Sequence, residues 1–130
     1  MTEFSLPIRV YLEDTDAGGI VYYVNYLKYM ERSRTEWLRT TGFDFNALIA
    51  CKLQFVVHSM QADYHMPAKM DDELNVTTTL EKVARTYILF AQEVRRQESV
   101  LCSAKVKVAC ISSETLRPKP MPRSLFEVKN

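Results

Sequence analysis

Three carboxylates stand in one loop near the start of the chain, beside a pair of adjacent glycines. The acids are Glu13, Asp14 and Asp16, and the glycines are Gly18 and Gly19. A carboxylate can attack a carbonyl carbon as a nucleophile, or it can activate water as a general base. Glycines tolerate positive φ and let the backbone approach a ligand closely. The loop therefore has the residue types of a site that attacks an electrophile.

The segment after this loop, residues 22–40, supplies a complementary group. Apolar and aromatic side chains recur every three to four positions, which predicts a helix, and Gly42 fits its C′ position. No Ser, Thr or Asp stands at the expected N-cap, so the first backbone N–H groups are left open for another acceptor. N–H groups at a helix N-terminus stabilise developing negative charge. A carboxylate in the loop 13–21 could therefore act on whatever electrophile these groups hold.

The rest of the sequence predicts one antiparallel sheet. Segments rich in β-branched residues are separated by short polar breaks that suit hairpins. Strands are predicted at 6–12, 53–65, 74–83, 86–96 and 99–112, and a short helix or a turn at 43–52. One long helix against one antiparallel sheet gives a single α+β domain, residues 1–130. Its sheet edges and apolar residues need cover, which predicts a homo-oligomer.

Composition excludes several classes of protein. The 130 residues include 17 Lys and Arg and 16 Asp and Glu, so no general nucleic-acid surface is expected. The N-terminus lacks the pattern of a signal peptide, and no apolar run approaches the roughly 18 residues of a membrane span. Cys51, Cys102 and Cys110 include no CxxC motif, which favours reduced thiols over disulfides or a zinc site. We therefore expect a cytoplasmic protein without a transmembrane segment.

Several other polar residues fit structural roles better than catalytic ones. His58 and His65 have no neighbour at metal-ligand spacing, so we expect neither a metal nor another cofactor. No GxSxG motif marks a serine nucleophile. Glu31 and Arg34 are predicted to form a buried ion pair within the helix.

The stretch YLEDTDAGGIVYYVNYL, residues 11–27, resembles the hotdog-fold thioesterases. It is similar to the 4-hydroxybenzoyl-CoA thioesterase superfamily and, within it, to the YbgC-type acyl-CoA thioesterases of the tol–pal cluster. The pattern DTDxxGxVYYxxY carries the resemblance most specifically. Similarity extends through Tyr64-His-Met-Pro67-Ala and Asp72-Glu-Leu-Asn-Val to the proline-rich basic tail, and so covers nearly the whole chain.

The resemblance implies a fold and an activity. The fold is a hotdog, one long central helix wrapped by a curved antiparallel sheet of about five strands, in dimers that pair sheets edge to edge and often in tetramers. The activity is hydrolysis of a thioester with no metal. The family's catalytic aspartate corresponds to Asp16, and its carbonyl-polarising backbone N–H corresponds to Tyr23. Substrate contacts are expected from the loop residues Gly18, Gly19, Val21 and Tyr22.

Without the resemblance, Asp16 fits a turn residue better than a catalyst. Glu13 and Asp14 could instead cap the loop or pair with Arg9. The resemblance favours Asp16 as the catalyst, acting as nucleophile or as general base, and the sequence does not choose between these mechanisms.

Cations are also required if the substrate is acyl-CoA, because CoA carries phosphates. Arg85, at a predicted hairpin, is a candidate substrate contact, as are Arg117, Lys119 and Arg123 in the tail. The basic tail also suits an anionic partner, such as acyl carrier protein, a lipid surface or enzymes of phospholipid synthesis.

Three functions are compatible with these residues. The first is an acyl-CoA or acyl-carrier-protein thioesterase of lipid metabolism. The second is a hotdog protein that binds acyl thioesters, or scaffolds lipid-metabolism partners, with little turnover. The third is a hotdog dehydratase, which usually requires a His base on the helix. Neither His58 nor His65 lies within residues 22–40, which argues against this function. The complete acidic motif favours the first.

Overall fold

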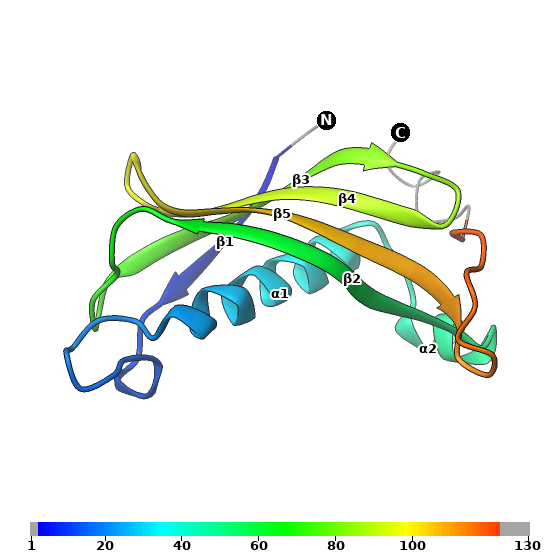
Figure 1. Cartoon of the computed structure of the whole chain (residues 1–130), viewed down its shortest axis with the longest axis horizontal. Coiled ribbons are helices and arrows are strands. Elements are labelled where there is room, and N and C mark those ends of the chain that lie inside the picture. Colours follow the sequence, from blue (N-terminus) through cyan, green and yellow to red (C-terminus); the bar gives the residue numbers. More distant parts are fainter. Residues whose placement is uncertain (1–2, 123–130) are drawn as a thin grey trace.

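The computed structural model describes residues 3–122 as one curved antiparallel sheet that arches over a long helix (Figure 1). In chain order the elements are β1 (Phe4–Arg9), η1 (Leu12–Asp14), α1 (Tyr23–Thr40), α2 (Phe45–Ala50), β2 (Leu53–Tyr64), β3 (Glu73–Val83), β4 (Tyr87–Arg96) and β5 (Ser99–Ser112). The expected α+β hotdog architecture, with one long helix and a sheet of five strands, is confirmed.

The predicted element boundaries mostly agree with the structure. The first strand ends at Arg9 rather than at residue 12, because the chain turns there into the single 3-10 turn η1. Gly42 has φ 79° and follows the C-cap of α1, as predicted for a C′ glycine. Residues 43–52 contain the short helix α2, whose first turn is capped by Asp44: its Oδ1 accepts the Asn46 N–H at 2.8 Å.

The strand order is β1-β3-β4-β5-β2, and each neighbouring pair is antiparallel. The sheet therefore has two edges, β1 and β2. Strand β2 is 12 residues long and pairs with β5 only, so its other side presents unpaired backbone groups among the described residues. Its pairing shifts by one residue between Val57 and Ser59, which is a β-bulge in the middle of this edge.

The core lies between α1 and the sheet. The helix buries Tyr29, Met30 and Trp37, and the Trp37 ring meets Phe90 of β4 edge-on at 5.4 Å between centroids. A fully buried side chain of this size stabilises the fold by roughly 2 to 3 kcal/mol. This packing holds α1 across the sheet and so fixes where its N-terminus points.

A buried polar network also joins the helix to the sheet. Ser33 Oγ donates to the Val76 carbonyl at 2.8 Å, and Gln92 Nε2 donates to the Met30 carbonyl at 3.0 Å. The predicted Glu31–Arg34 ion pair is wrong: Glu31 is exposed and accepts from Thr35 Oγ1. Arg34 instead donates to Gln92, because a neutral amide oxygen satisfies the guanidinium without the cost of burying a second charge.

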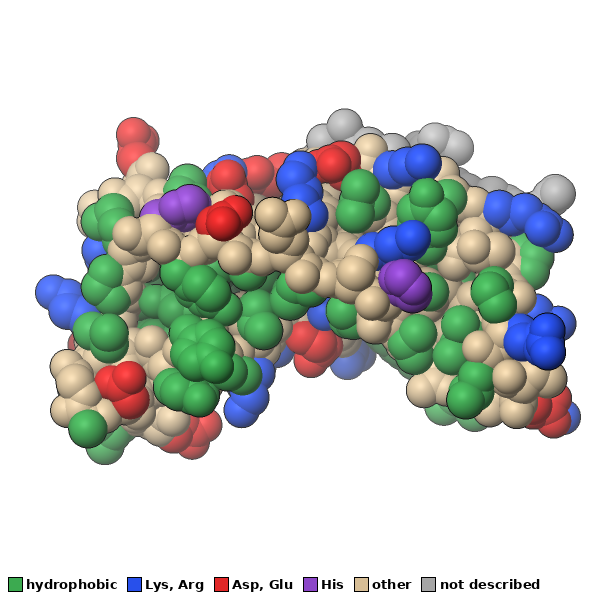
Figure 2. All heavy atoms as spheres, in the orientation of Figure 1, with side chains coloured by type: hydrophobic (Ala, Val, Ile, Leu, Met, Phe, Trp, Pro, Cys, Tyr) green, Lys and Arg blue, Asp and Glu red, His purple; other side chains and the backbone are tan. Residues whose placement is uncertain are grey.

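The two ends of the molecule differ in the side chains that they expose. Figure 2 shows several Lys and Arg side chains at the end that carries α2 and the C-terminal segment, and hydrophobic side chains around the start of α1 at the other end. The face between the two ends is hollowed. Within residues 3–122, no helix is both long and apolar enough to cross a membrane.

Candidate active site

Asp16 opens a tight turn at the tip of the loop between η1 and α1. Its carbonyl accepts the Gly19 N–H at 3.0 Å, and its own N–H donates to the Ile20 carbonyl at 3.0 Å. Its Oδ1 accepts the Gly18 N–H at 2.9 Å, while Oδ2 has no hydrogen-bond partner among the described residues. Gly19 has φ 79°, which an L-residue adopts only with strain. The turn thus fixes one carboxylate oxygen and leaves the other exposed.

Asp14 anchors this loop to the helix. It is only 7% exposed, and its Oδ2 accepts the Tyr11 N–H at 2.9 Å. Its Oδ1 accepts Nδ2 of Asn25, in the first turn of α1, also at 2.9 Å. Its backbone carbonyl accepts the Tyr22 N–H at 2.9 Å. Of the two roles considered for Asp14, capping the loop is therefore confirmed.

The first residue of α1 is Tyr23, and no side chain caps the helix, as the sequence predicted. The preceding N–H groups are occupied: that of Val21 donates to the Ala68 carbonyl at 2.8 Å, and that of Tyr22 to Asp14. The Tyr23 N–H, by contrast, finds no acceptor within residues 3–122. It is therefore a free donor at the positive end of an 18-residue helix, seven positions after Asp16.

A cluster of tyrosines surrounds this donor. The Tyr22 and Tyr23 rings lie 5.0 Å apart, and Tyr64, at the end of β2, meets Tyr23 edge-on at 6.0 Å. All three are about half exposed. Tyr26 lies beneath them, and its hydroxyl oxygen accepts the Ala68 N–H at 2.9 Å. Aromatic surface beside a free N–H suits a ligand that has both a carbonyl oxygen and an apolar body.

The predicted substrate contacts fall into three groups. Gly18 and Gly19 share the turn with Asp16, and Tyr22 exposes its ring beside the helix start. Val21 is only 4% exposed, and its side chain packs in the core. The third group, represented by Arg85, lies elsewhere.

Arg85 occupies the β3–β4 turn at the opposite end of the sheet (Figure 1). Strand β3 separates it from the loop, and its 11 residues span on the order of 35 Å. The C-terminal segment crosses the same end, where Met121 N–H donates to the Arg85 carbonyl at 2.8 Å. Arg117 and Lys119 lie in this segment, and Arg123 is outside the described residues. One chain alone therefore does not bring Arg85, Arg117 or Lys119 to Asp16.

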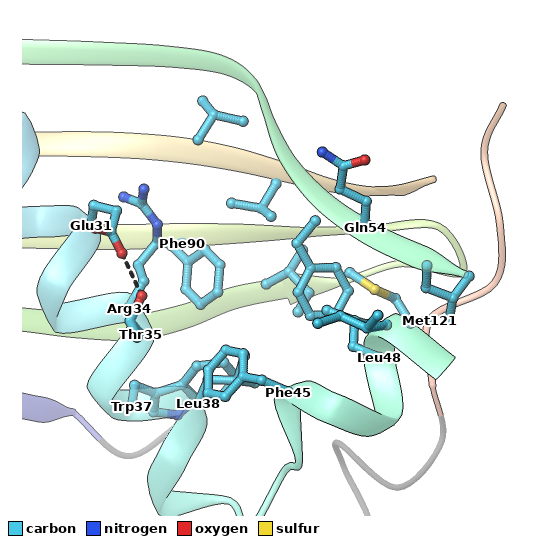
Figure 3. A pocket seen from close by; sticks show the side chains of 16 residues that line it. Glu31, Arg34, Thr35, Trp37, Leu38, Phe45, Leu48, Gln54, Phe90 and Met121 are labelled. Atoms are coloured by element: carbon cyan, nitrogen blue, oxygen red, sulfur yellow. Dashed lines mark hydrogen bonds between the residues drawn. The ribbon is translucent and has the colours of Figure 1, made fainter. Parts of the chain in front are cut away.

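An apolar cavity of about 410 Å³ opens between the C-terminal half of α1, α2 and the sheet (Figure 3). Its walls include Trp37, Phe45, Leu48, Phe55, Phe90 and Met121. At one end of the cavity lie the polar side chains of Glu31, Arg34 and Thr35. Burial lowers the pKa of Arg34 below its usual value. The volume falls within the range of small-molecule sites.

The cavity and the acidic loop are separated within one chain. Tyr23 at the start of α1 and Arg34 at the cavity's polar end are eleven positions apart along the helix, a rise of about 16 Å. The walls of this cavity are mostly apolar, and its lining carboxylate, Glu31, lies in the middle of α1 and accepts from Thr35 Oγ1, away from the free backbone donor at the helix start. The loop is therefore the candidate site for the chemistry, and the cavity is a candidate for holding an apolar group.

The histidines and several charged residues stay outside the loop site. His65 Nε2 lies 2.9 Å from Ser103 Oγ, and His58 is exposed on β2. Arg9 pairs with Asp71 at 3.4 Å rather than with the loop acids. Over residues 3–122, no three His, Cys, Asp or Glu side chains come close enough to hold a metal ion.

Sequence reasoning missed Asn25 as part of the site. Its amide ties α1 to Asp14, and this contact links residues eleven positions apart in the chain. The sequence feature that could have revealed Asn25 is its place as a polar residue in the first turn of a helix rich in aromatic residues, shortly after the acidic loop.

Together, the loop and the helix start present an exposed carboxylate oxygen, a free backbone donor and aromatic surface. A carbonyl oxygen at the Tyr23 N–H would be polarised, and its carbon would become open to attack by Asp16 or by water that Asp16 activates. This arrangement suits acyl transfer to water.

Comparisons with known proteins agree with this geometry. A family model described as the thioesterase-like superfamily matches residues 10–128. The "acyl-CoA thioesterase YbgC" of Haemophilus influenzae is 45% identical over 123 residues, which cover 94% of this chain and 90% of that protein. The "acyl-CoA thioester hydrolase YbgC" of Escherichia coli O6:H1 is 40% identical, over 95% of this chain and 93% of its own. The crystal structure of a probable thioesterase from Bartonella henselae superposes with a TM-score of 0.82 at 36% identity, over 92% of this chain and 98% of that one.

Proposed function

Because this chain belongs to the thioesterase-like superfamily, we propose that it is an enzyme that hydrolyses acyl-CoA thioesters to a free acid and a thiol. Asp16 is the catalytic carboxylate, and the Tyr23 N–H is the donor to the carbonyl oxygen. The observation that carries this assignment is the exposed carboxylate of Asp16 in a fixed turn, seven residues before an uncapped helix with a free first N–H.

Two routes lead from this arrangement to the products. In one, Asp16 attacks the thioester carbon; the C–S bond breaks, the thiolate leaves and takes up a proton, and water then hydrolyses the mixed anhydride. In the other, Asp16 removes a proton from water, which attacks the carbon and expels the thiolate directly. In both, negative charge develops on the carbonyl oxygen, and the Tyr23 N–H with the helix dipole stabilises it.

The active enzyme is a homo-oligomer in which β2 pairs antiparallel with β2 of a second copy. The open edge of β2 supports this assembly, because an unpaired strand of 12 residues is a template for another strand. The two ends of β2 differ: Leu53 lines the apolar cavity, and Tyr64 touches Tyr23. Antiparallel pairing brings the Leu53 end of one copy beside the Tyr64 end of the other. Two such dimers form the tetramer.

This pairing joins the separated parts of the site. The cavity of one copy receives the acyl group of a thioester held at Asp16 of the other. The cations Arg85, Arg117 and Lys119 have no ion-pair partner among the described residues, so they are available for the CoA phosphates. The same basic end suits acyl carrier protein or enzymes of phospholipid synthesis as anionic partners in the cytoplasm.

A thiol-release assay tests the proposed function. Purified protein is given acetyl-, dodecanoyl- and benzoyl-CoA, and free CoA is measured with a thiol reagent alongside the molar mass by light scattering. Hydrolysis of at least one substrate by an oligomer is the expected result. Binding of acyl-CoA without thiol release would overturn the assignment and favour the scaffold function.

A further inference from the structure

We propose that Asp14 is a positioning residue for the reaction: it fixes the Asp16 loop against the first turn of α1, and so sets the distance between the Asp16 carboxylate and the Tyr23 N–H. This inference rests on the proposed function, which places the chemistry on those two groups. Asp14 does not itself touch the substrate, because its carboxylate is buried and both of its oxygens are occupied.

The contacts of Asp14 join three segments at one point. Its Oδ2 accepts the Tyr11 N–H before the loop, and its Oδ1 accepts the Asn25 amide on α1, each at 2.9 Å. Hydrogen bonds to a charged acceptor are about twice as strong as neutral ones. Losing one of the two would also leave a polar group unpaired in a mostly buried place.

The loop between these anchors is closed as well. The Asp14 carbonyl accepts the Tyr22 N–H at 2.9 Å, and Thr15 and Val21 form an antiparallel bridge above it. Asp16 follows directly, with its N–H bonded to Ile20. Both ends of the segment that carries Asp16 are thus tied to Asp14, and one end continues into the helix whose first N–H is the donor.

The surroundings of Asp14 make this anchor rigid. The Tyr29 side chain, fully buried below the loop, lies near the Asp14 carboxylate, and burial together with that carboxylate raises the pKa of Tyr29. Packed surroundings favour one arrangement of the loop, and the Tyr29 hydroxyl, which has no hydrogen-bond partner among the described residues, is a further donor close to the carboxylate. A reacting group displaced by about 1 Å can lose on the order of 100-fold in rate, so a loosened anchor should act on kcat.

Two variants test the anchor from its two sides. Asp14→Asn places an amide N–H against the Asn25 amide or the Tyr11 N–H, and Asn25→Ala removes the helix side alone. Each should lower kcat about 10- to 100-fold while KM for the same acyl-CoA stays within about twofold. The pH–rate profile of each variant should keep its acidic limb, since the proposed catalytic carboxylate is still present. Glu13→Gln is the matched control: it removes one charge from an exposed neighbour that has no hydrogen bond among the described residues, and kcat should be unchanged.

An exchange of partners supplies a rescue. In the double variant Asp14→Asn, Asn25→Asp, the amide at position 14 donates to a carboxylate at position 25 and still accepts from Tyr11. Its kcat should recover at least about tenfold over Asp14→Asn alone. Parental kcat in both single variants, loss of the acidic limb in Asp14→Asn, or failure of the double variant to recover would each overturn the positioning role.

A readout that does not use activity separates this inference from the proposed function. Amide hydrogen exchange followed by NMR should show loss of protection at Tyr22 in Asp14→Asn and in Asn25→Ala, with unchanged protection in β4. Unchanged protection at Tyr22 would overturn the anchor even if the protein hydrolysed no acyl-CoA. If the parent hydrolysed no acyl-CoA but both variants lost protection at Tyr22, the anchor would stand and the proposed function would be overturned.

Discussion

Arg34 Nη1 donates a hydrogen bond to Oε1 of Gln92 over 2.8 Å, and this contact joins the middle of α1 to strand β4. Gln92 is 1% exposed, and its Nε2 donates to the Met30 carbonyl and to Thr78 Oγ1. These bonds fix the amide so that its oxygen faces the guanidinium. Burial lowers the pKa of Arg34, which means that water solvates this cation poorly. The hydrogen bond to the amide oxygen of Gln92 therefore replaces part of its lost solvation.

Replacing Gln92 with Leu should therefore destabilise the fold strongly. The variant leaves the partly buried Arg34 guanidinium without its amide partner and removes the side-chain hydrogen bonds to the Met30 carbonyl and Thr78, at a cost of about 2 to 3 kcal/mol. Urea unfolding at pH 7 measures the change. Gln61→Leu, the same substitution on an exposed part of β2, is the matched control and should change stability by less than about 0.5 kcal/mol. Equal effects at the two positions would argue against a structural role for the network.

The two loop glycines should respond differently to alanine. A Cβ on Gly18 would lie 3.3 Å from Asp16 Oδ1, whereas one on Gly19 meets nothing within 4 Å. Gly18→Ala should thus displace the carboxylate and lower kcat about tenfold. Gly19→Ala should cost about 1 kcal/mol of stability, because its φ of 79° is strained for alanine. Steady-state kinetics and urea unfolding of both variants check this; a kcat unchanged in Gly18→Ala would contradict the geometry.

The salt bridge between Asp72 and Arg96, 2.7 Å long, should make stability depend on pH. Burial alone would raise the pKa of Asp72, but the Lys69 N–H and the Arg96 guanidinium outweigh it and hold that pKa below its usual value. Because the folded pKa is the lower one, this stabilisation is complete above about pH 4 and is lost as pH falls through the folded value. Asp72→Asn should therefore unfold at lower urea than the parent at pH 7, and the gap should shrink at pH 3. A gap that is equal at both pH values would contradict the assignment.

The apolar cavity should set the length of acyl chain that the enzyme accepts. Leu48 lies in the cavity wall contributed by α2. In Leu48→Trp the indole ring occupies part of the 410 Å³ cavity, so kcat/KM for dodecanoyl-CoA should fall at least about tenfold. Acetyl-CoA is the internal control, and its kcat/KM should stay within about twofold. Equal loss for both substrates would mean that the acyl chain does not enter this cavity.

Sequence periodicity was sufficient for the architecture because the signals are local. The spacing of aromatic residues over 22–40 and the alternation in β4 and β5 each depend on which side of one element faces the core. Gly42 was predictable for the same reason, since only a residue tolerant of positive φ ends a helix in this way.

The site was predictable only in part, because its contacts cross the chain. Asp16 and Tyr23 lie within seven residues, so a local motif was enough to propose them together. Gln92 is 58 residues from Arg34, and no local pattern indicates that Gln92, rather than Glu31, is the partner of Arg34. Arg85 failed to join Asp16 in one chain for a related reason: the length of β3 separates them, and only a second copy could close that gap.

The central claim is that Asp16 performs the chemistry, and Asp16→Asn tests it most directly. The amide Oδ1 can still accept the Gly18 N–H, so the turn should persist and the unfolding midpoint should match the parent. Asp44→Asn makes the same exchange at the N-cap of α2, where Oδ1 also accepts a backbone N–H, and serves as the control. With acyl-CoA as substrate, kcat of Asp16→Asn should fall at least ~100-fold while that of Asp44→Asn stays parental. A folded Asp16→Asn protein that releases CoA at the parental rate would contradict the mechanism.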